Sequence, residues 1–188
     1  MQGIFLTHGH ADAIGALPYI LQEFKAPVFG SPLTIELAKL FVKKNNNVKK
    51  FNNFHVIDAE TEIEFADATI SFFKTTHSVP ESLGIVVGTD EGNIVYTGDF
   101  KFDQAARKYY RTDLGRLTEI GREGVLALLS DSANATSHVM TASEAEVAAE
   151  MYSAIADAEG RVIIAAVASN LVRIQQVFCT QLLNMVVV

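Results

Sequence analysis

Cysteine is nearly absent from this chain, since the 188 residues include one, Cys179. A single thiol excludes an internal disulfide and fits the reducing conditions of the cytosol. The N-terminus lacks a basic start followed by an apolar stretch and a small-residue cleavage site, and no apolar run is long enough to span a bilayer. These absences predict a soluble, cytoplasmic protein that does not enter a membrane.

Positive charge is also scarce, because 15 Lys and Arg residues face 22 Asp and Glu residues and the formal net charge is -7. This balance argues against a protein that coats nucleic acid by bulk electrostatics. It does not exclude a nuclease, because bound metal ions can supply the positive charge that meets a phosphodiester. The short basic stretch Lys49-Lys50 could touch a phosphate backbone, but a solvated loop is the favoured interpretation.

Apolar residues, in contrast, are plentiful enough for a sizeable core. The chain is 49% hydrophobic and 20% charged, as an ordinary globular protein is. Its length suits one domain, or one domain and part of another, and we find no internal repeat or low-complexity linker.

The stretch from Thr7 to Gly15 places two imidazoles and a carboxylate within five residues. An apolar run, residues 4–6, precedes it and predicts a strand, and an amphipathic run, residues 14–24, follows it and predicts a helix. In extended chain between the two, His8 and His10 point to the same side because side chains alternate with period two. Asp12 then falls at the helix start. The cluster predicts a divalent metal site, against the plainer alternative of two turn histidines beside a capping aspartate.

The next segments predict alternating helix and strand. Residues 27–30 form a short strand, and Ser31-Pro32 opens a helix that ends in Lys43-Lys44-Asn45. Five short runs with β-branched or aromatic residues then predict strands in one sheet with hairpin character: 54–57, 62–65, 69–73, 84–87 and 93–96.

Two of these strands end in residues that suit metal chemistry, His77 and Asp99. Ligands are commonly mounted on loops that a rigid scaffold positions. Taken alone, His77 is more often an ordinary hydrogen-bonded histidine and Asp99 a turn residue after Gly98. His55 and His138 lack a comparable setting, and we interpret both as structural.

The last third predicts helix, strand and helix in turn. A helix over 113–122 precedes a buried strand over 125–129, which leads into Ser130-Asp131-Ser132. Ser143 begins a capping box, and its helix should run to Gly160. An apolar strand over 161–167 follows, and Asn170 can cap a final helix.

Five segments together resemble the metallo-β-lactamase superfamily and, within it, the ribonuclease J family of the β-CASP group: THGHADAIGALPYIL, THSVPESLGIVV, YTGDFKFD, LLSDSANA and ASNLVRIQQV. The first is typical of the whole superfamily and the other four point to ribonuclease J. Alanine at position 13 is similar to the divergent second paralogue of Gram-positive bacteria. The resemblance implies an α/β fold (an α+β sandwich), a partial αββα metallo-β-lactamase domain over 1–132, and the beginning of a β-CASP domain over 133–188.

The resemblance also implies the roles of single residues. His8, His10 and His77 match the imidazole ligands of a first metal, Asp99 the carboxylate that bridges two metals, and Asp12 a ligand of the second. Ala13 stands where the family has a second-metal histidine, and alanine cannot coordinate. Asp131 matches an acidic residue thought to orient a proton donor, so Asp12 and Asp131 are the candidate catalytic residues. A turn aspartate is the plainer interpretation of Asp131.

These assignments lead to one principal hypothesis and two alternatives. The first is an RNA-degrading metallo-hydrolase, with Zn²⁺ or Mn²⁺ at one plausible site, an impaired second site and weak or lost activity. It would act on RNA beside a paralogous ribonuclease J subunit. The alternatives are a non-catalytic, metal-free assembly subunit of an RNA-degrading complex and a small-molecule hydrolase of the same superfamily. The family has earlier strands before Gly3 and further domains after Phe178, so we expect a fragment or truncated product.

Overall fold

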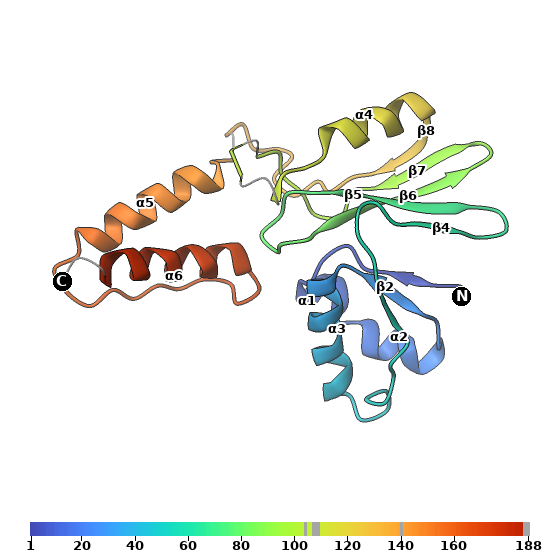
Figure 1. Cartoon of the computed structure of the whole chain (residues 1–188), viewed down its shortest axis with the longest axis horizontal. Coiled ribbons are helices and arrows are strands. Elements are labelled where there is room, and N and C mark those ends of the chain that lie inside the picture. The colour runs from blue at the N-terminus through green and yellow to red at the C-terminus, as the bar shows by residue number, and fades with distance from the viewer. Residues whose placement is uncertain (104, 107–109, 140, 186–188) are drawn as a thin grey trace.

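The computed structural model describes residues 1–103, 105–106, 110–139 and 141–185 (Figure 1). Its strands are β1 (Ile4–Phe5), β2 (Val28–Gly30), β3 (Phe54–Val56), β4 (Glu62–Glu64), β5 (Thr69–Lys74), β6 (Leu83–Thr89), β7 (Gly92–Tyr96) and β8 (Val125–Leu129). Its helices are α1 (Ala11–Ile14), α2 (Leu17–Glu23), α3 (Pro32–Lys44), α4 (Leu114–Glu123), α5 (Glu144–Ala156) and α6 (Leu171–Met185).

Two sheets pack face to face between two layers of helix. The small sheet has the order β1-β2-β3 and is parallel, whereas the large sheet has the order β4-β5-β6-β7-β8 and is antiparallel except for the β7–β8 pair. Helices α1 to α3 lie beside the small sheet and α4 lies over the large sheet (Figure 1). This αββα arrangement confirms the predicted fold class.

Strand β5 shows how the alternation of side chains builds these layers. Phe72 and Phe73 are both buried, yet successive residues of a strand point to opposite faces. Phe72 faces the small sheet, where its ring centroid lies 6.0 Å from that of Phe5. Phe73 faces outward and packs in a cluster with Ile120 of α4. Each face of this strand therefore holds a different layer.

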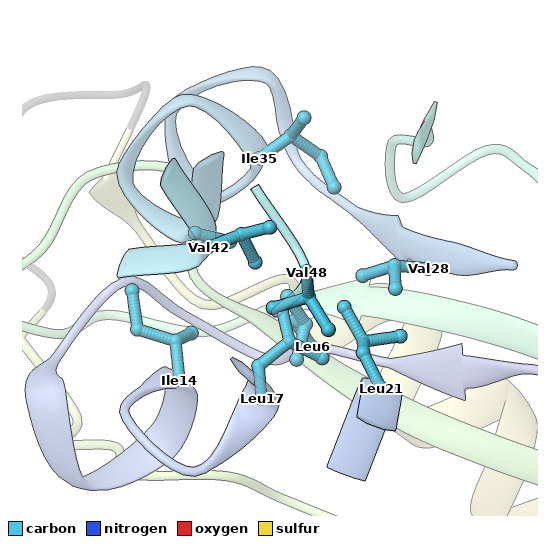
Figure 2. Packing of buried hydrophobic residues seen from close by; sticks show 9 residues of the cluster. Leu6, Ile14, Leu17, Leu21, Val28, Ile35, Val42 and Val48 are labelled. Atoms are coloured by element: carbon cyan, nitrogen blue, oxygen red, sulfur yellow. The ribbon is translucent and has the colours of Figure 1, made fainter. Parts of the chain in front are cut away.

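A second core lies between the small sheet and its helices. Figure 2 shows its side chains pointing toward one another from the two short helices, from α3 and from the strands. The labelled members are Leu6, Ile14, Leu17, Leu21, Val28, Ile35, Val42 and Val48. The loop that carries His8 and His10 begins directly after Leu6, so this core fixes the start of that loop.

The prediction of one sheet from five strands is wrong in two respects: it includes β3, which belongs to the small sheet, and it leaves out β8, which belongs to the large sheet. β3 leaves the set and pairs in parallel with β2, while β8 takes the outer place in the large sheet. The cause is the connection through α3, since a strand reached through a crossover helix returns parallel to the strand before it. The predicted helix over 14–24 is also divided, because Pro18 lies in the first turn of α2 and begins a new helix there.

Three predictions for the last third are wrong in detail. The strand over 125–129 exists but is exposed, because β8 is an edge strand paired only with β7. Residues 161–167 form no strand and are exposed, because no strand of the described chain lies beside them to pair. The helix that begins with the Ser143 capping box ends at Ala156 and not at Gly160.

The helices α5 and α6 lie side by side and extend away from the sandwich (Figure 1). The predicted N-caps of these two helices are confirmed, since Ser143 forms its capping box with Glu146 and the Asn170 carboxamide oxygen accepts a hydrogen bond from the Arg173 amide. Ser31 lies at the N-cap of α3, but its side chain makes no capping hydrogen bond. The division at 132/133 remains a prediction, and residues 186–188 of its second part lie outside the described residues. Among the helices of the described chain, none is long and apolar enough to cross a membrane.

Replacing Gly84 with alanine is expected to destabilise the large sheet. A Cβ on Gly84 would lie 2.1 Å from the Phe73 ring, which is buried under α4 and cannot withdraw. Overpacking of this kind costs about 1–3 kcal/mol of unfolding free energy, measurable by urea denaturation. The matched control is Gly121→Ala in α4, where a Cβ meets nothing within 4 Å and helix propensity favours alanine. Equal stability of the two variants would contradict the packing described here.

Candidate metal centre

Three histidines from two loops form a cluster at the edge where the two sheets meet. His8 and His10 lie in the loop between β1 and α1, and His77 lies in the loop after β5. One ring nitrogen of each lies within 4.8 Å of one ring nitrogen of the others. The ring centroids are 5.1 Å apart for His8 and His10, 4.7 Å for His8 and His77, and 4.8 Å for His10 and His77. The predicted convergence of these three side chains is confirmed.

Asp99 faces the same cluster from the end of β7. Its Oδ2 lies 3.5 Å from Nε2 of His8 and 3.7 Å from Nε2 of His77. Gly98 makes this approach possible, because it adopts a φ of +58° and an added Cβ there would lie 3.0 Å from the Thr7 side chain. A residue other than glycine would be strained in that conformation and would push the Asp99 loop away from His8.

His8 is the most enclosed member, with 2% of its surface exposed. Its Nδ1 contacts the Thr7 hydroxyl at 3.0 Å, while Nε2 is buried and has no hydrogen-bond partner among the described residues. Burial lowers the pKa of His8, and the nearby His10 lowers it further, although Asp99 acts in the opposite direction. The ring is therefore neutral at pH 7, with a lone pair available at a buried nitrogen.

His77 shares these properties. Its Nε2 is buried and likewise has no hydrogen-bond partner in the described parts of the chain. Burial lowers the pKa of His77 to about 4, His8 and His10 contribute in the same direction, and the Asp131 and Asp12 carboxylates oppose the shift. The last two effects place both predicted catalytic aspartates close enough to act electrostatically on the cluster.

His10 differs because both of its ring nitrogens have partners. Nδ1 lies 2.7 Å from the Ser169 hydroxyl and Nε2 lies 2.8 Å from the Ser78 hydroxyl. The sequence analysis did not single out either serine. The available signal was their position, since Ser78 follows His77 directly and Ser169 lies in the segment ASNLVRIQQV.

The remaining predicted residues surround the cluster without joining it. Asp12 lies in the first turn of α1 and is exposed, and Ala13 beside it is exposed as well. The Asp131 carboxylate accepts a hydrogen bond from the Ala133 amide at 2.8 Å, which is the turn geometry of the plainer interpretation. Among the described residues, the side chains close enough to share one metal ion are therefore the three histidines. Asp99 lies beside them.

The chemistry of this donor set fits a divalent metal ion. Neutral imidazoles and a carboxylate are suitable ligands for Zn²⁺ and related ions. Two buried nitrogens without partners carry a desolvation cost that a cation would relieve. The cluster therefore suggests a metal site at this position.

An ionic network attaches α5 and α6 next to the cluster. Lys101 Nζ lies 2.8 Å from the Glu144 carboxylate, and the Glu144 amide donates to Asp103 at 2.7 Å. Burial alone would raise the pKa of Asp103, but this amide and Lys101 together lower it. Arg173 of α6 reaches the same glutamate at 3.3 Å. A cavity of about 400 Å³ opens beside this network, and its wall includes His77, Tyr110, Tyr152 and Gln176.

The ion-free protein is expected to lose stability as the pH falls from about 6.5 to about 4. The pKa of His77 is about 4 in the folded chain and 6.5 ordinarily, so within this window the unfolded state binds a proton that the folded state does not. Urea midpoints measured in EDTA should fall across that window and fall less steeply in His77→Gln. An unchanged slope in that variant would show that His77 does not carry the effect.

Comparisons with known proteins agree with this geometry. The family model described as "Beta-lactamase superfamily domain" matches residues 1–163. The chain is 77% identical over 178 residues to ribonuclease J 2 of Streptococcus pyogenes, 48% identical over 177 residues to ribonuclease J 2 of Staphylococcus epidermidis, and 47% identical over 177 residues to that of Staphylococcus aureus. These alignments cover 95%, 94% and 94% of this chain but 32% of each relative, so the chain spans about a third of their length. With its sandwich and histidine cluster in the expected places, the chain belongs to the beta-lactamase superfamily and is similar to the ribonuclease J 2 proteins.

Proposed function

We propose that this chain is part of a ribonuclease J-type RNA hydrolase whose own activity is weak or lost. One observation carries the proposal: three imidazoles and Asp99 converge as a first metal site requires, while Ala13 stands where the second site needs a histidine. The similarity to ribonuclease J 2 proteins supports RNA as the substrate class.

His8, His10, His77 and Asp99 would hold one ion, either Zn²⁺ or Mn²⁺. When bound, a divalent ion polarises phosphoryl oxygens and generates a nucleophile from water at neutral pH. The protein contributes the neutral state of the imidazoles, because burial keeps the pKa of both His8 and His77 below its ordinary value. Protonated imidazoles could not serve as ligands, so this burial prepares the site.

A second ion would find far fewer ligands. Asp12 and Asp99 are the two carboxylates on that side, and the Ala13 methyl group offers no lone pair. Two carboxylates without an imidazole hold a transition metal weakly, since the site then has too few protein ligands and Zn²⁺ in addition favours imidazole nitrogen. Phosphodiester hydrolysis by a two-metal mechanism uses both ions, and the weak second site is our reason for weak activity.

Asp131 is a candidate for a supporting catalytic role. Its backbone is fixed by the Thr97 hydroxyl, and its carboxylate opposes the lowering of the His77 pKa. A carboxylate in this position could orient a proton donor toward the leaving oxygen. The cavity beside His77 offers two tyrosine rings, and aromatic rings are common stacking platforms for single-stranded bases.

The proposed role of the whole protein is to act in the cytoplasm as the partner of an active ribonuclease J paralogue in an RNA-degrading complex, where weak activity of its own would be sufficient. A fully non-catalytic, metal-free assembly subunit is the second candidate. The exposed Asp12 and Ala13 favour it, since neither contributes to a closed metal site. The two candidates differ in whether the histidine cluster binds an ion.

Restoring the missing histidine is expected to restore hydrolysis. In the longest form that the gene encodes, assayed with Mn²⁺ or Zn²⁺ on 5′-monophosphorylated RNA, Ala13→His should raise the rate on the order of 100-fold, the scale of one added charge-stabilising group. Asp99→Ala should abolish the residual rate. Robust hydrolysis by the unmodified protein, lost in Asp99→Ala but not raised by Ala13→His, would show that the proposed impairment is wrong.

Metal analysis separates the two candidate functions. The purified protein, dialysed against Zn²⁺ or Mn²⁺, should bind about one ion per chain, and Ala13→His should bind about two, because the second site then gains its imidazole. His8→Ala should bind none, while His55→Ala is the matched control, since His55 lies on β3 with its ring stacked on Phe29. No bound ion in the unmodified protein would favour the metal-free assembly subunit.

A further inference from the structure

We infer that Ser78 is a positioning residue for the metal centre. It holds His10 by Nε2, so that Nδ1 is offered to an ion, and Ser169 occupies Nδ1 until the ion displaces it. This inference rests on the proposed metal site and concerns how that site is loaded.

The argument begins with the two partners of His10. A neutral imidazole has one N–H donor and one lone pair, and both of its nitrogens are engaged here by serine hydroxyls at 2.8 and 2.7 Å. An ion that binds His10 needs the lone pair, so one of the two hydroxyls must leave. Which one leaves depends on how firmly each serine is held.

Ser78 is held by the loop of the sandwich itself. This loop is buried at Val79, and the Ser82 hydroxyl donates to the Val79 carbonyl at 2.7 Å. At its end the Leu83 amide donates to the Thr7 carbonyl at 2.9 Å, and the Glu81 carboxylate accepts from the first turn of α3 at 2.8 Å. Ser78 therefore lies in a loop that follows His77 directly and is hydrogen-bonded to the segment of Thr7, which precedes His8 and His10.

Ser169 is held more loosely. It follows directly after the segment 161–168, which is exposed and contains no strand or helix. The next main-chain contact of this region with the site loop, from the Val172 amide to the Ser78 carbonyl, is 3.3 Å long. The backbone that carries Ser169 therefore lies in a less constrained segment, whereas the backbone of Ser78 is continuous with the loop that carries His77.

Each serine hydroxyl can donate or accept, so both contacts are compatible with either tautomer of the ion-free ring. When an ion takes the Nδ1 lone pair, the proton must lie on Nε2, where Ser78 would accept its hydrogen bond. His8 shows the same logic with its nitrogens exchanged, because Thr7 engages Nδ1 and Nε2 has no partner among the described residues. Hydroxyls of the sandwich thus contact one ring nitrogen of each of these histidines, as outer partners of metal-binding imidazoles commonly do.

Co²⁺ titration of the ion-free 188-residue chain, followed by visible absorption, tests this assignment. Ser78→Ala should weaken Co²⁺ binding roughly tenfold to hundredfold, the usual cost of losing an outer partner of a ligand. Ser78→Thr keeps the hydroxyl and should restore the affinity of the unmodified protein. Ser169→Ala is the matched control on the same ring, and it should bind Co²⁺ equally well or more tightly, because a competitor for Nδ1 is gone.

Nitrogen-15 NMR of the His10 ring supplies a readout that does not depend on the ion. The Nε2–H tautomer should dominate in Ser169→Ala, where Ser78 is the remaining hydroxyl partner of the ring, and the Nδ1–H tautomer should dominate in Ser78→Ala, where Ser169 remains. Thermal melts confirm that each variant folds. Unchanged Co²⁺ affinity in Ser78→Ala, or a larger loss in Ser169→Ala than in Ser78→Ala, would overturn the inference. If the unmodified chain binds no Co²⁺, the proposed metal site itself is wrong, which is a distinct result.

Discussion

The hydrogen bond from the Leu83 amide to the Thr7 carbonyl is the contact on which the geometry of the site depends. Thr7 precedes His8 at the end of the small sheet's first strand, and Leu83 opens β6 in the large sheet. Apolar side chains fill most of the space between the two sheets, and they pack without fixing a register. A directional bond at the rim holds the loops of His8 and His77 at one separation.

The second constraint is electrostatic. The cluster gathers three basic groups in a buried place, and burial keeps the pKa of His8 and His77 below its ordinary value. Lys101 and Arg173 both form ion pairs with Glu144, and these pairs join α5 and α6 to the loop after β7. The histidine cluster and this attachment point are neighbours, yet Lys101 and Arg173 pair with Glu144 and not with the cluster.

Much of the fold could be predicted because periodicity and capping are local. The Ser143 capping box and the alternation in β5 follow from residues near one another, as does the pairing of His8 with His10. The place of His77 beside them is expected from the family resemblance, because His77 follows a strand of the other sheet. Pairing partners could not be predicted, since the strand-like pattern of residues 54–57 is the same whether β3 joins β2 or β4. Residues 161–167 have strand composition but no neighbour, and a strand is stable only when its backbone groups find partners. The contacts of Ser78 and Ser169 with His10 join residues 68 and 159 positions apart, which no local pattern reveals.

The order of the proposed ligands along the chain also sets the order in which they become available during synthesis. His8, His10, His77 and Asp99 have all been made before α4 begins, and Ser169 follows Asp99 by 70 residues, the difference between their positions. At roughly 5–20 residues per second, the ribosome needs roughly 4–14 seconds to cover that distance. If these residues are the ligands, the nascent chain carries the proposed set during that interval without Ser169, and His10 then lacks that hydrogen-bond partner.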